Sequence, residues 1–355
     1  MIISGVSLQN FRIHGSIVVE FSPGTTIITG PNGSGKTSII EALYVALRGT
    51  SFKGVDGDIL GPNRKWWRVD ISFSDGTKRS VKYNPESING KKQFIIDGKT
   101  HYRLPAKNKK PVVLFEPNDL RLLNGSPGRR REFIDKFISQ INPEYHMAIN
   151  KYERALKQRN NLLKNKNSTS EDLFVWDVVL SEYGAQIIQQ RLEFIDKIND
   201  KINSLYQELS ETKDAISVHY SHPYSGDIKQ KLLNELSRSA DKDRVLGYTT
   251  TGPHRNDIIF NFNNSPALTI ASRGEVRTVI VALKFLEVAL IEDVLGVEPL
   301  ILLDDVFSEL DEKRQKHLSR LDGSSQVVIT STTSPATNKK SLGTKIRRVN
   351  LRRED

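Results

Sequence analysis

The sequence predicts an α/β fold with an antiparallel flap near its start and a helical lobe inserted in its middle. Three observations lead to this prediction. A glycine-rich loop at residues 30–37 follows a strand pattern and precedes a helix pattern. Residues 66–103 alternate between polar and apolar positions, as antiparallel strands do. Residues 126–241 repeat apolar positions at spacings of three and four, which is typical of amphipathic helices.

The N-terminal segment supplies the frame of the glycine-rich loop. Residues 3–8, 17–21 and 25–29 are predicted strands, joined by turn-prone glycine and proline. A helix is predicted from Thr37, and Gly49 is placed to end it. The segment therefore has the order strand, loop, helix.

The flap and the strand after it are predicted from turns and apolar runs. Asp-Gly pairs at residues 75–76 and 97–98 stand between strand-like arms, as hairpin turns do. A short apolar run at residues 111–117 is bounded by prolines and predicts a buried strand.

One long helix is predicted from Leu173 to Leu209, on the order of 50 Å at 1.5 Å per residue. A polar segment from Asn165 separates it from an earlier helix pair. Apolar, β-branched runs at residues 299–303 and 326–330 then predict central strands covered on both faces. We expect three regions: the first part of an α/β domain, which holds the glycine-rich loop (residues 1–120), a helical lobe (121–245) and the second part of the α/β domain (246–355).

Composition narrows the class of protein. The 355 residues carry 52 Lys and Arg against 42 Asp and Glu, a net charge of +10, which favours nucleic acid as partner, although a basic chain can also serve solubility alone. The sequence has neither an apolar stretch long enough for a membrane span nor the features of a signal peptide, so we expect a cytoplasmic protein. Without cysteine, and without histidines at metal-ligand spacing, the expected metal is Mg²⁺ brought by a nucleotide.

The glycine-rich loop fits the Walker A pattern of nucleotide-binding proteins. Its backbone N–H groups can surround phosphates at the positive end of the following helix. Lys36 is expected to reach the β- and γ-phosphates, and the hydroxyl of Thr37 to bind Mg²⁺. The expected ATP-binding residues are Gly30, Pro31, Asn32, Gly33, Ser34, Gly35, Lys36, Thr37 and Ser38.

An apolar run that ends in Asp304 and Asp305 fits the Walker B strand. Ligands bind at the carboxyl ends of strands in open α/β sheets. Asp304 is therefore expected to bind Mg²⁺ with Thr37, and Asp305 to orient or activate the attacking water, so that Asp305 and Lys36 are the expected catalytic residues. The alternative is that the two acids only cap the next helix.

Two further motifs resemble the ABC-type ATPases. Ser272-Arg-Gly-Glu275 resembles their signature motif, with Ala271 in place of leucine and Glu275 in place of glutamine, and residues 308–311 resemble their D-loop. The resemblance implies an ATP-dependent dimer in which Ser272, Gly274 and Asp311 of one subunit contact the ATP of the other, since a helix N-terminus can meet phosphate.

Several stretches are similar to the RecF family in particular: residues 9–12, 116–120, 125–130, 252–257 and 303–311. The resemblance implies an ABC-ATPase-type head with weak ATPase activity that binds duplex or gapped DNA. It also implies recombinational repair in which the protein promotes RecA loading together with RecR and RecO.

Four further residues lie outside the Walker and signature motifs. The resemblance implies that Arg12 lies near the nucleotide as a phosphate contact. Thr330 stands at a strand end where a transporter ATPase would have a histidine, so it is either a γ-phosphate sensor or an ordinary strand-end residue. His254 and Arg255 lie in a Gly-Pro turn and are assigned no chemistry.

Positive charge gathers on the first part of the helical lobe. Phosphate contacts need only cations within reach, so this part can bind duplex DNA without reading its sequence, although a solvated helix face is the usual reason for such a run. The expected DNA-binding residues are Arg129, Arg130, Arg131, Lys151, Arg154, Lys157 and Arg159.

These features suggest a switch in which ATP drives dimerisation, the dimer forms one basic surface, and hydrolysis opens it. The same motifs would also fit three other functions. A transporter energising subunit is disfavoured by the missing switch histidine, and a structural head of the SMC type by a helical region of about 120 residues, too short for a long coiled-coil arm. A DNA-binding module with a vestigial ATP site stays open.

Overall fold

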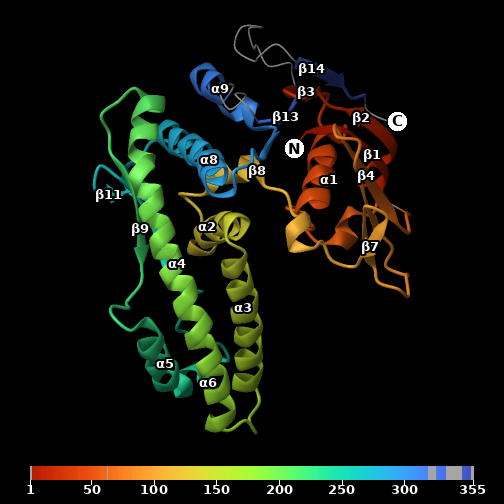
Figure 1. Ribbon diagram of the computed structural model, residues 1–355. Helices are drawn as coiled ribbons and strands as arrows, with labels where there is room; N and C mark the ends of the chain where they lie inside the picture. Colours follow the sequence, from red (N-terminus) through yellow and green to blue (C-terminus); the bar gives the residue numbers. More distant parts are fainter. Residues whose placement is uncertain (1, 62, 319–324, 333–345, 353–355) are drawn as a thin grey trace. The chain divides into compact units, whose positions relative to one another are not determined.

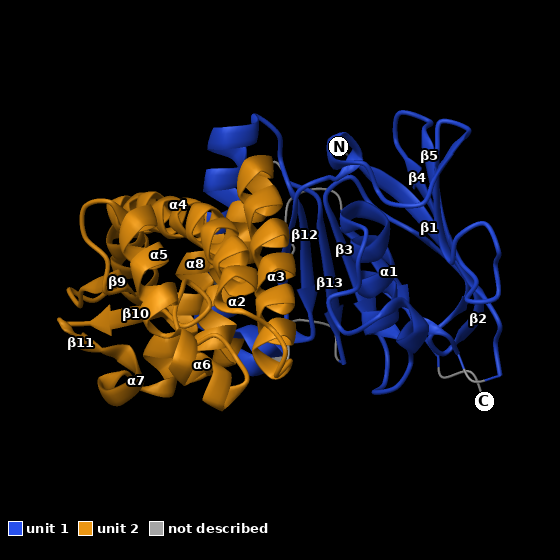
Figure 2. Ribbon diagram, turned by 90° about the horizontal axis from the view of Figure 1, so that it is seen from below, with its two compact units in different colours: residues 1–119, 287–355 blue, residues 120–286 orange. Residues whose placement is uncertain are grey.

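The computed structural model describes residues 2–61, 63–318, 325–332 and 346–352 (Figure 1). The chain divides into two compact units (Figure 2): residues 1–119 and 287–355 form unit 1, and residues 120–286 form unit 2. Unit 1 is thus built from both ends of the sequence. Unit 2 extends past residue 245, the expected end of the helical lobe, and the domain boundaries themselves stay a prediction. In the described ranges, no helix is long and apolar enough to cross a membrane.

The first sheet of unit 1 is antiparallel and has the order β2-β1-β4-β5-β6-β7. The flap is therefore confirmed, and the first two strands of the chain belong to the same sheet. Gly76 and Gly98 adopt the positive φ that its turns require. The strands are β1 (Ile3–Phe11), β2 (His14–Glu20), β4 (Trp67–Phe73), β5 (Lys78–Tyr83), β6 (Lys92–Ile96) and β7 (Lys99–His101).

The second sheet of unit 1 has the order β14-β3-β13-β12-β8, and all its neighbouring strands are parallel. Every residue of β12 and β13 is buried, which confirms that the two late apolar runs form central strands. The strands are β3 (Thr25–Thr29), β8 (Val112–Phe115), β12 (Leu300–Asp304), β13 (Val327–Ser331) and β14 (Ile346–Asn350).

Helix α1 (Lys36–Arg48) contacts strands of both sheets and ends at Gly49, as expected. Because both of its sides are covered, Ile39, Ile40 and Leu43 are fully buried in the core that joins the sheets. Burial of each such side chain contributes about 1.5–3 kcal/mol. The shorter helices of this part are η1 (Asp56–Ile59), η2 (Ala106–Asn108), η4 (Val306–Glu309) and α9 (Glu312–Leu318), with η3 (Pro117–Arg121) at the boundary to unit 2.

Unit 2 is built around the long helix α4 (Ser170–Ser210), 41 residues or about 60 Å, and α3 runs beside it (Figure 1). The helix begins at a capping box in which Thr169 and Asp172 bond each other's backbone N–H groups. The long helix is therefore confirmed. The other helices are α2 (Pro127–Ile141), α3 (Pro143–Lys164), α5 (Ile228–Arg238), α6 (Ala240–Leu246), α7 (Ala267–Ile270) and α8 (Arg273–Leu295), which continues into unit 1.

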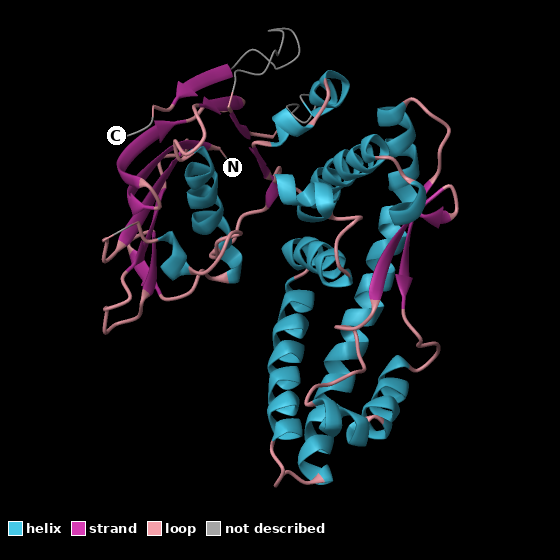
Figure 3. Ribbon diagram, turned by 180° about the vertical axis from the view of Figure 1, so that it is seen from behind, coloured by secondary structure: helices cyan, strands magenta, loops and turns pink. Residues whose placement is uncertain are grey.

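The helical prediction was wrong at residues 216–221, which form strand β9 (Ile216–Ser221) (Figure 3). This strand pairs with β10 (Asp257–Phe262), which pairs with β11 (Ser265–Pro266). Ile216, Val218 and Tyr220 are buried and the residues between them are exposed, a period of two rather than 3.6. The alternation covers only 6 residues and lies within a long stretch of helical pattern, so the sequence does not distinguish it from a helix.

Candidate nucleotide-binding site

The loop between β3 and α1 needs glycine at particular positions. Gly35 has φ +81°, and a Cβ there would collide with the ring of His14. A Cβ on Gly30 would lie 2.7 Å from the carbonyl oxygen of Leu351. His14 also lies 3.1 Å, through Nε2, from the carbonyl oxygen of Gly35. The loop is therefore closely supported by β2 and by the segment after β14.

Lys36 points into this loop. Its Nζ donates to the carbonyl oxygens of Gly30 (3.0 Å) and Pro31 (3.2 Å), and it lies 4.0 Å from Oδ2 of Asp305. The side chain is almost fully buried. Since an ammonium group has three donors, it can hold two carbonyls and still donate to an anion.

The carboxyl ends of β12 and β13 meet the start of α1. Thr37 Oγ1 donates to Asp304 Oδ1 at 2.8 Å, although the two residues are 267 positions apart. Thr330 Oγ1 donates to the same oxygen at 3.0 Å and accepts from the backbone N–H of Asp305 at 2.9 Å. Parallel strands end at one sheet edge, which explains why these residues converge.

This oxygen pair is suited to Mg²⁺. Mg²⁺ prefers oxygen ligands, keeps several waters and takes one or two protein ligands beside nucleotide phosphates. In the described part of the chain, no group of three or more His, Asp or Glu could hold a metal on its own. A metal at Thr37 and Asp304 would therefore be completed by the nucleotide and water.

Asp305 follows β12 in a left-handed conformation, with φ +51°. Burial raises the pKa of its carboxyl group and Asp304 raises it further, whereas Lys36 and Lys53 oppose the rise. A raised pKa makes a carboxylate a better proton acceptor. Lys53, whose Nζ lies 4.0 Å from Oδ2 of Asp304, belongs to no recognised motif and could not be predicted from the sequence.

Arg12 lies against the helix of the P-loop. Its guanidinium donates to both carboxylate oxygens of Glu41 on α1, at 2.8 and 2.7 Å, and to the carbonyl oxygen of Asp58. The hydrogen bond to Glu41 raises the pKa of Arg12. This bidentate pair fixes the position of Arg12. A contact between Arg12 and phosphate stays a prediction.

A pocket of about 240 Å³ adjoins the loop. Within the described residues, the buried Oγ of Ser34 has no hydrogen-bond partner, which suits a polar group of a ligand. The pocket is lined by Ile13, His14, Ile17, Ser34, Asn350, Leu351 and Arg352. Apart from Ser34, these residues lie outside the Walker motifs and could not be predicted as site residues from the sequence.

The signature serine belongs to unit 2, where it caps α8. Ser272 Oγ accepts from the backbone N–H of Glu275 at 3.3 Å, and Glu275 Oε2 accepts from the N–H of Ser272 at 2.6 Å. This is a capping box, in which either Glu or Gln can fill the third helical position. The capping bond therefore explains why Glu275 can replace the glutamine of the signature motif. In unit 1, Asp311 caps α9 through the N–H of Arg314 at 2.9 Å. The contacts of Ser272, Gly274 and Asp311 with ATP stay predictions.

Two of the expected DNA contacts were wrong. Arg159 has no exposed surface and donates to Asp177 and to Asp243, each at 2.6 Å. Arg130 is 8% exposed and forms a bidentate pair with Asp257 at 2.9 and 2.7 Å. A buried guanidinium that is already paired with carboxylates is not available to a phosphate.

The other five basic residues differ in exposure. Lys151, Arg154 and Lys157 are exposed on α3, whereas Arg129 and Arg131 are partly buried. Arg131 donates to a backbone carbonyl at 2.6 Å, and burial lowers its pKa. The three residues of α3 therefore remain the most accessible.

The turn at residues 252–257 organises unit 2. His254 Nδ1 lies 2.7 Å from the hydroxyl of Tyr152 on α3, and Arg191 on α4 donates to the carbonyl oxygen of Pro253 at 2.8 Å. Asn256 accepts from the hydroxyl of Tyr220 on β9 at 3.1 Å. Burial lowers the pKa of His254 to about 4, so that the ring is neutral near pH 7. The turn thus ties two helices to a strand.

The strand order of the parallel sheet indicates the class of protein. A P-loop after β3, with acids at the end of β12 two strands away, is the arrangement of an ABC-type P-loop ATPase head. A family model described as an AAA domain matches residues 6–242. The DNA replication and repair protein RecF of Clostridium beijerinckii is 31% identical over 349 residues, covering 93% of this chain and 91% of its own length. That of Lachnoclostridium phytofermentans is 34% identical over 345 residues, covering 94% and 93%. The chain belongs to the RecF family.

Solved structures support the same family and fold. A structure of the recombination mediator protein RecF-ATP in the RecFOR pathway matches with a TM-score of 0.84 and 28% identity, covering 95% of this chain and 93% of that one. An SMC head bound to the C-winged helix domain of ScpA matches with a TM-score of 0.53 and 15% identity, covering 94% and 90%, and shows the fold alone. The predicted fold class, an ABC-ATPase-type head with a flap and a helical lobe, is confirmed.

Proposed function

We propose that this protein is an ATP-dependent DNA-binding protein of recombinational repair, which dimerises on ATP and hydrolyses it slowly. The observation that carries the proposal is the 2.8 Å contact between Thr37 and Asp304, beside a Lys36 held inside the loop. Membership of a family of DNA replication and repair proteins, one of which is described with ATP, supports the link to DNA and to this nucleotide.

ATP would bind with its phosphates in the loop at residues 30–38. Lys36 would donate to the β- and γ-phosphates, and Thr37 and Asp304 would hold Mg²⁺, which neutralises phosphate charge when bound. Asp305, with its raised pKa and its place beside Lys36, would orient the attacking water.

A second subunit would complete this site. Ser272 and Gly274 lie at the start of the 23-residue helix α8, whose N-terminus carries positive partial charge suited to a γ-phosphate. Asp311 would contribute from the start of α9. ATP would therefore favour the dimer, and hydrolysis would favour its separation.

DNA would bind on the helical lobe. The exposed Lys151, Arg154 and Lys157 and the partly buried Arg129 and Arg131 supply sequence-independent phosphate contacts, and a dimer would join two such surfaces. We propose binding at duplex DNA and single-strand gap junctions, RecA loading with RecR and RecO, and a cytoplasmic location.

The direct test measures binding of duplex and gapped DNA with ATP, ADP or no nucleotide, together with the mass of the protein in solution. Tighter binding and a dimer are expected with ATP alone. Equal affinities under all three conditions would contradict the coupling. Hydrolysis that DNA does not stimulate would favour a DNA-binding module with a vestigial ATP site.

A further inference from the structure

The outer face of the antiparallel sheet carries a row of polar side chains. The strand register pairs Gln9 with Arg68, Arg68 with Lys82, and Lys82 with Gln93. Residues directly opposite on neighbouring strands point to the same face. Gln9, Arg68, Lys82 and Gln93 therefore form one row across β1, β4, β5 and β6.

A second row lies beside the first. Trp66, Asn84 and Lys91 are each two positions from a member of the first row, so they share its face. The backbone N–H of Asn84 donates to the carbonyl oxygen of Lys91 at 2.8 Å, which confirms their pairing. Both rows line one pocket of about 360 Å³, which we call the flap pocket; a volume of about 300–1,000 Å³ is usual for ligand sites. The rest of its lining is Trp67, Tyr83, Ser87 and Gly90.

The lining of the flap pocket is entirely basic or neutral. Arg68, Lys82 and Lys91 line it, and no carboxylate does. Arg68 is fixed by Asp70 through two hydrogen bonds of 2.7 and 2.8 Å. Within the part of the chain that the structure describes, neither Lys82 nor Lys91 forms an ion pair. The pocket therefore offers two uncompensated cations to an anion.

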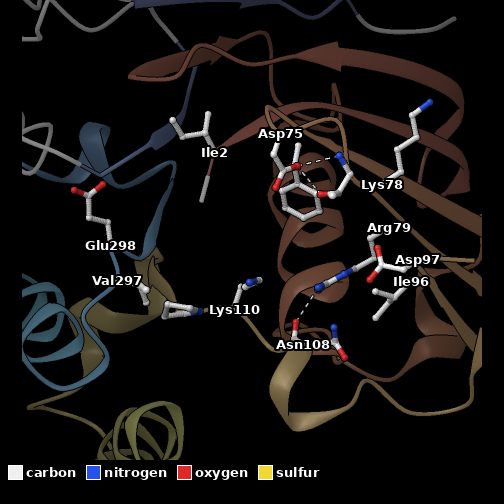
Figure 4. Close-up of a pocket in the computed structure, with 13 residues that line it drawn as sticks. Ile2, Asp75, Lys78, Arg79, Ile96, Asp97, Asn108, Lys110, Val297 and Glu298 are labelled. Carbon is white, nitrogen blue, oxygen red and sulfur yellow. Dashed lines mark hydrogen bonds between the residues drawn. The ribbon is translucent and has the colours of Figure 1, made fainter. Parts of the chain in front are cut away.

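A second pocket of unit 1, shown in Figure 4, differs from the flap pocket in the charge of its lining. It has a volume of about 460 Å³ and is lined by acidic and basic groups in equal number. Its Arg79 is buried and donates to the carbonyl oxygen of Asn108 at 2.8 Å. This pocket selects neither sign of charge, so the net positive lining of the flap pocket is a local property. Its charged residues are Asp75, Asp97, Glu298, Lys78, Arg79 and Lys110.

The flap pocket also presents an aromatic surface. Trp66 is 41% exposed, and amide side chains stand beside it. Proteins that bind single-stranded nucleic acid stack bases on exposed aromatic rings and track the phosphates with cations, and amides can bond base edges. A paired base does not offer its face in this way.

We infer that the flap pocket binds an unpaired nucleotide of single-stranded DNA, with the base on Trp66 and the two phosphates that flank it at Lys82 and Lys91. The inference rests on the proposed function and adds to it a contact for the unpaired strand of a gap. It uses unit 1, whereas the proposed duplex contacts lie on unit 2.

The test uses the full-length protein with ATP and measures fluorescence anisotropy of a labelled 20-nucleotide oligo-dT and of a blunt 20-base-pair duplex. Trp66→Ala is expected to weaken oligo-dT binding about tenfold, with duplex binding unchanged. Trp66→Phe should keep most of the affinity and lose the quenching of tryptophan fluorescence by oligo-dT.

The lysines are tested through salt dependence. Lys82→Gln combined with Lys91→Gln should lower the slope of log affinity against log salt for oligo-dT by about 1.4, or about 0.7 for each phosphate contact. The matched control is Lys78→Gln with Lys99→Gln, two exposed lysines of the same sheet that do not line the pocket. The control should keep the wild-type slope.

The outcomes separate the inference from the proposed function. Wild-type oligo-dT affinity in a Trp66→Ala protein with an unchanged melting temperature would overturn the inference and leave duplex binding intact. Equal weakening of oligo-dT and duplex would also overturn it, because the surface would then serve phosphates alone. Quenching by free dTMP without oligo-dT binding would indicate a mononucleotide site instead. A wild-type protein that binds no DNA under any condition would contradict the proposed function itself.

Discussion

Units 1 and 2 both bury cations, but they use them differently. In unit 1, the ammonium of Lys36 is held by two carbonyl oxygens, with its nearest carboxylate 4.0 Å away. In unit 2, Arg159 is bonded by two aspartates, and Arg191 by Asp135 at 2.9 and 2.8 Å. The first arrangement leaves charge for a ligand, whereas the second neutralises it inside the fold. A basic sequence is therefore not by itself a basic surface.

The largest expected effect concerns the buried charge of unit 2. Arg159→Ala should lower the free energy of unfolding by about 3–5 kcal/mol, because it leaves Asp177 and Asp243 buried without their partner. The control is Lys157→Ala, which changes an exposed lysine of the same helix and should alter the free energy of unfolding by less than about 0.5 kcal/mol. Urea unfolding measures both. Similar losses of unfolding free energy in the two variants would mean that the buried ion pairs of Arg159 do not stabilise unit 2 more than an exposed lysine does.

The corresponding change in unit 1 should affect activity. Lys36→Ala should reduce the rate of ATP hydrolysis about 10²–10³-fold, since it removes a donor to the phosphates. Lys197→Ala, an exposed lysine of α4, serves as the control and should keep the wild-type rate. A steady-state phosphate-release assay measures the rate of ATP hydrolysis of both variants. Wild-type hydrolysis by Lys36→Ala would remove this loop from the chemistry.

A pH dependence is expected from unit 2. His254 has a pKa of about 4 in the folded protein because of burial, against about 6.5 when unfolded. Between these values the unfolded chain binds a proton that the folded chain does not, so stability is lost as pH falls from about 6.5 to 4, by about 3 kcal/mol at most. Urea unfolding at pH 7 and pH 5 should show a larger loss in wild type than in His254→Asn. The same loss in both would mean that His254 is not the titrating group.

A smaller loss of rate is expected at the acid after β12. Asp305→Asn should slow hydrolysis about 100-fold while ATP binding, measured by calorimetry, is retained, because the amide cannot accept a proton. Asp75→Asn, an exposed acid of unit 1, is the control. If Asp305→Asn turns over ATP at the wild-type rate, Asp305 has no catalytic role.

The smallest effect is expected at the cap of α8. Ser272→Ala should lower the free energy of unfolding by about 1 kcal/mol through the lost capping bond. Glu275→Gln should keep the capping box and cost less than about 0.5 kcal/mol. Urea unfolding of the two variants tests this. A larger loss in Glu275→Gln than in Ser272→Ala would contradict it.

Most of unit 1 could be predicted because its motifs and strands depend on patterns among residues close in sequence. Each Walker motif is formed by neighbours in sequence, and the flap follows from polar–apolar alternation and two Asp-Gly turns. The partners of Arg159 lie 18 and 84 positions away, and a helix-face charge looks the same whether it is solvated or paired. For the same reason the pair between Arg12 and Glu41 could not be predicted.

The place of β3 in its sheet bears on how the chain is made. This strand carries the P-loop, yet its two neighbours, β13 and β14, come from the last part of the sequence. A growing chain on the ribosome can complete unit 2, which is contiguous from residue 120 to 286, while β3 still lacks both neighbours. The strand that precedes the glycine-rich loop therefore gains both of its sheet neighbours only after the residues of unit 2 have been synthesised.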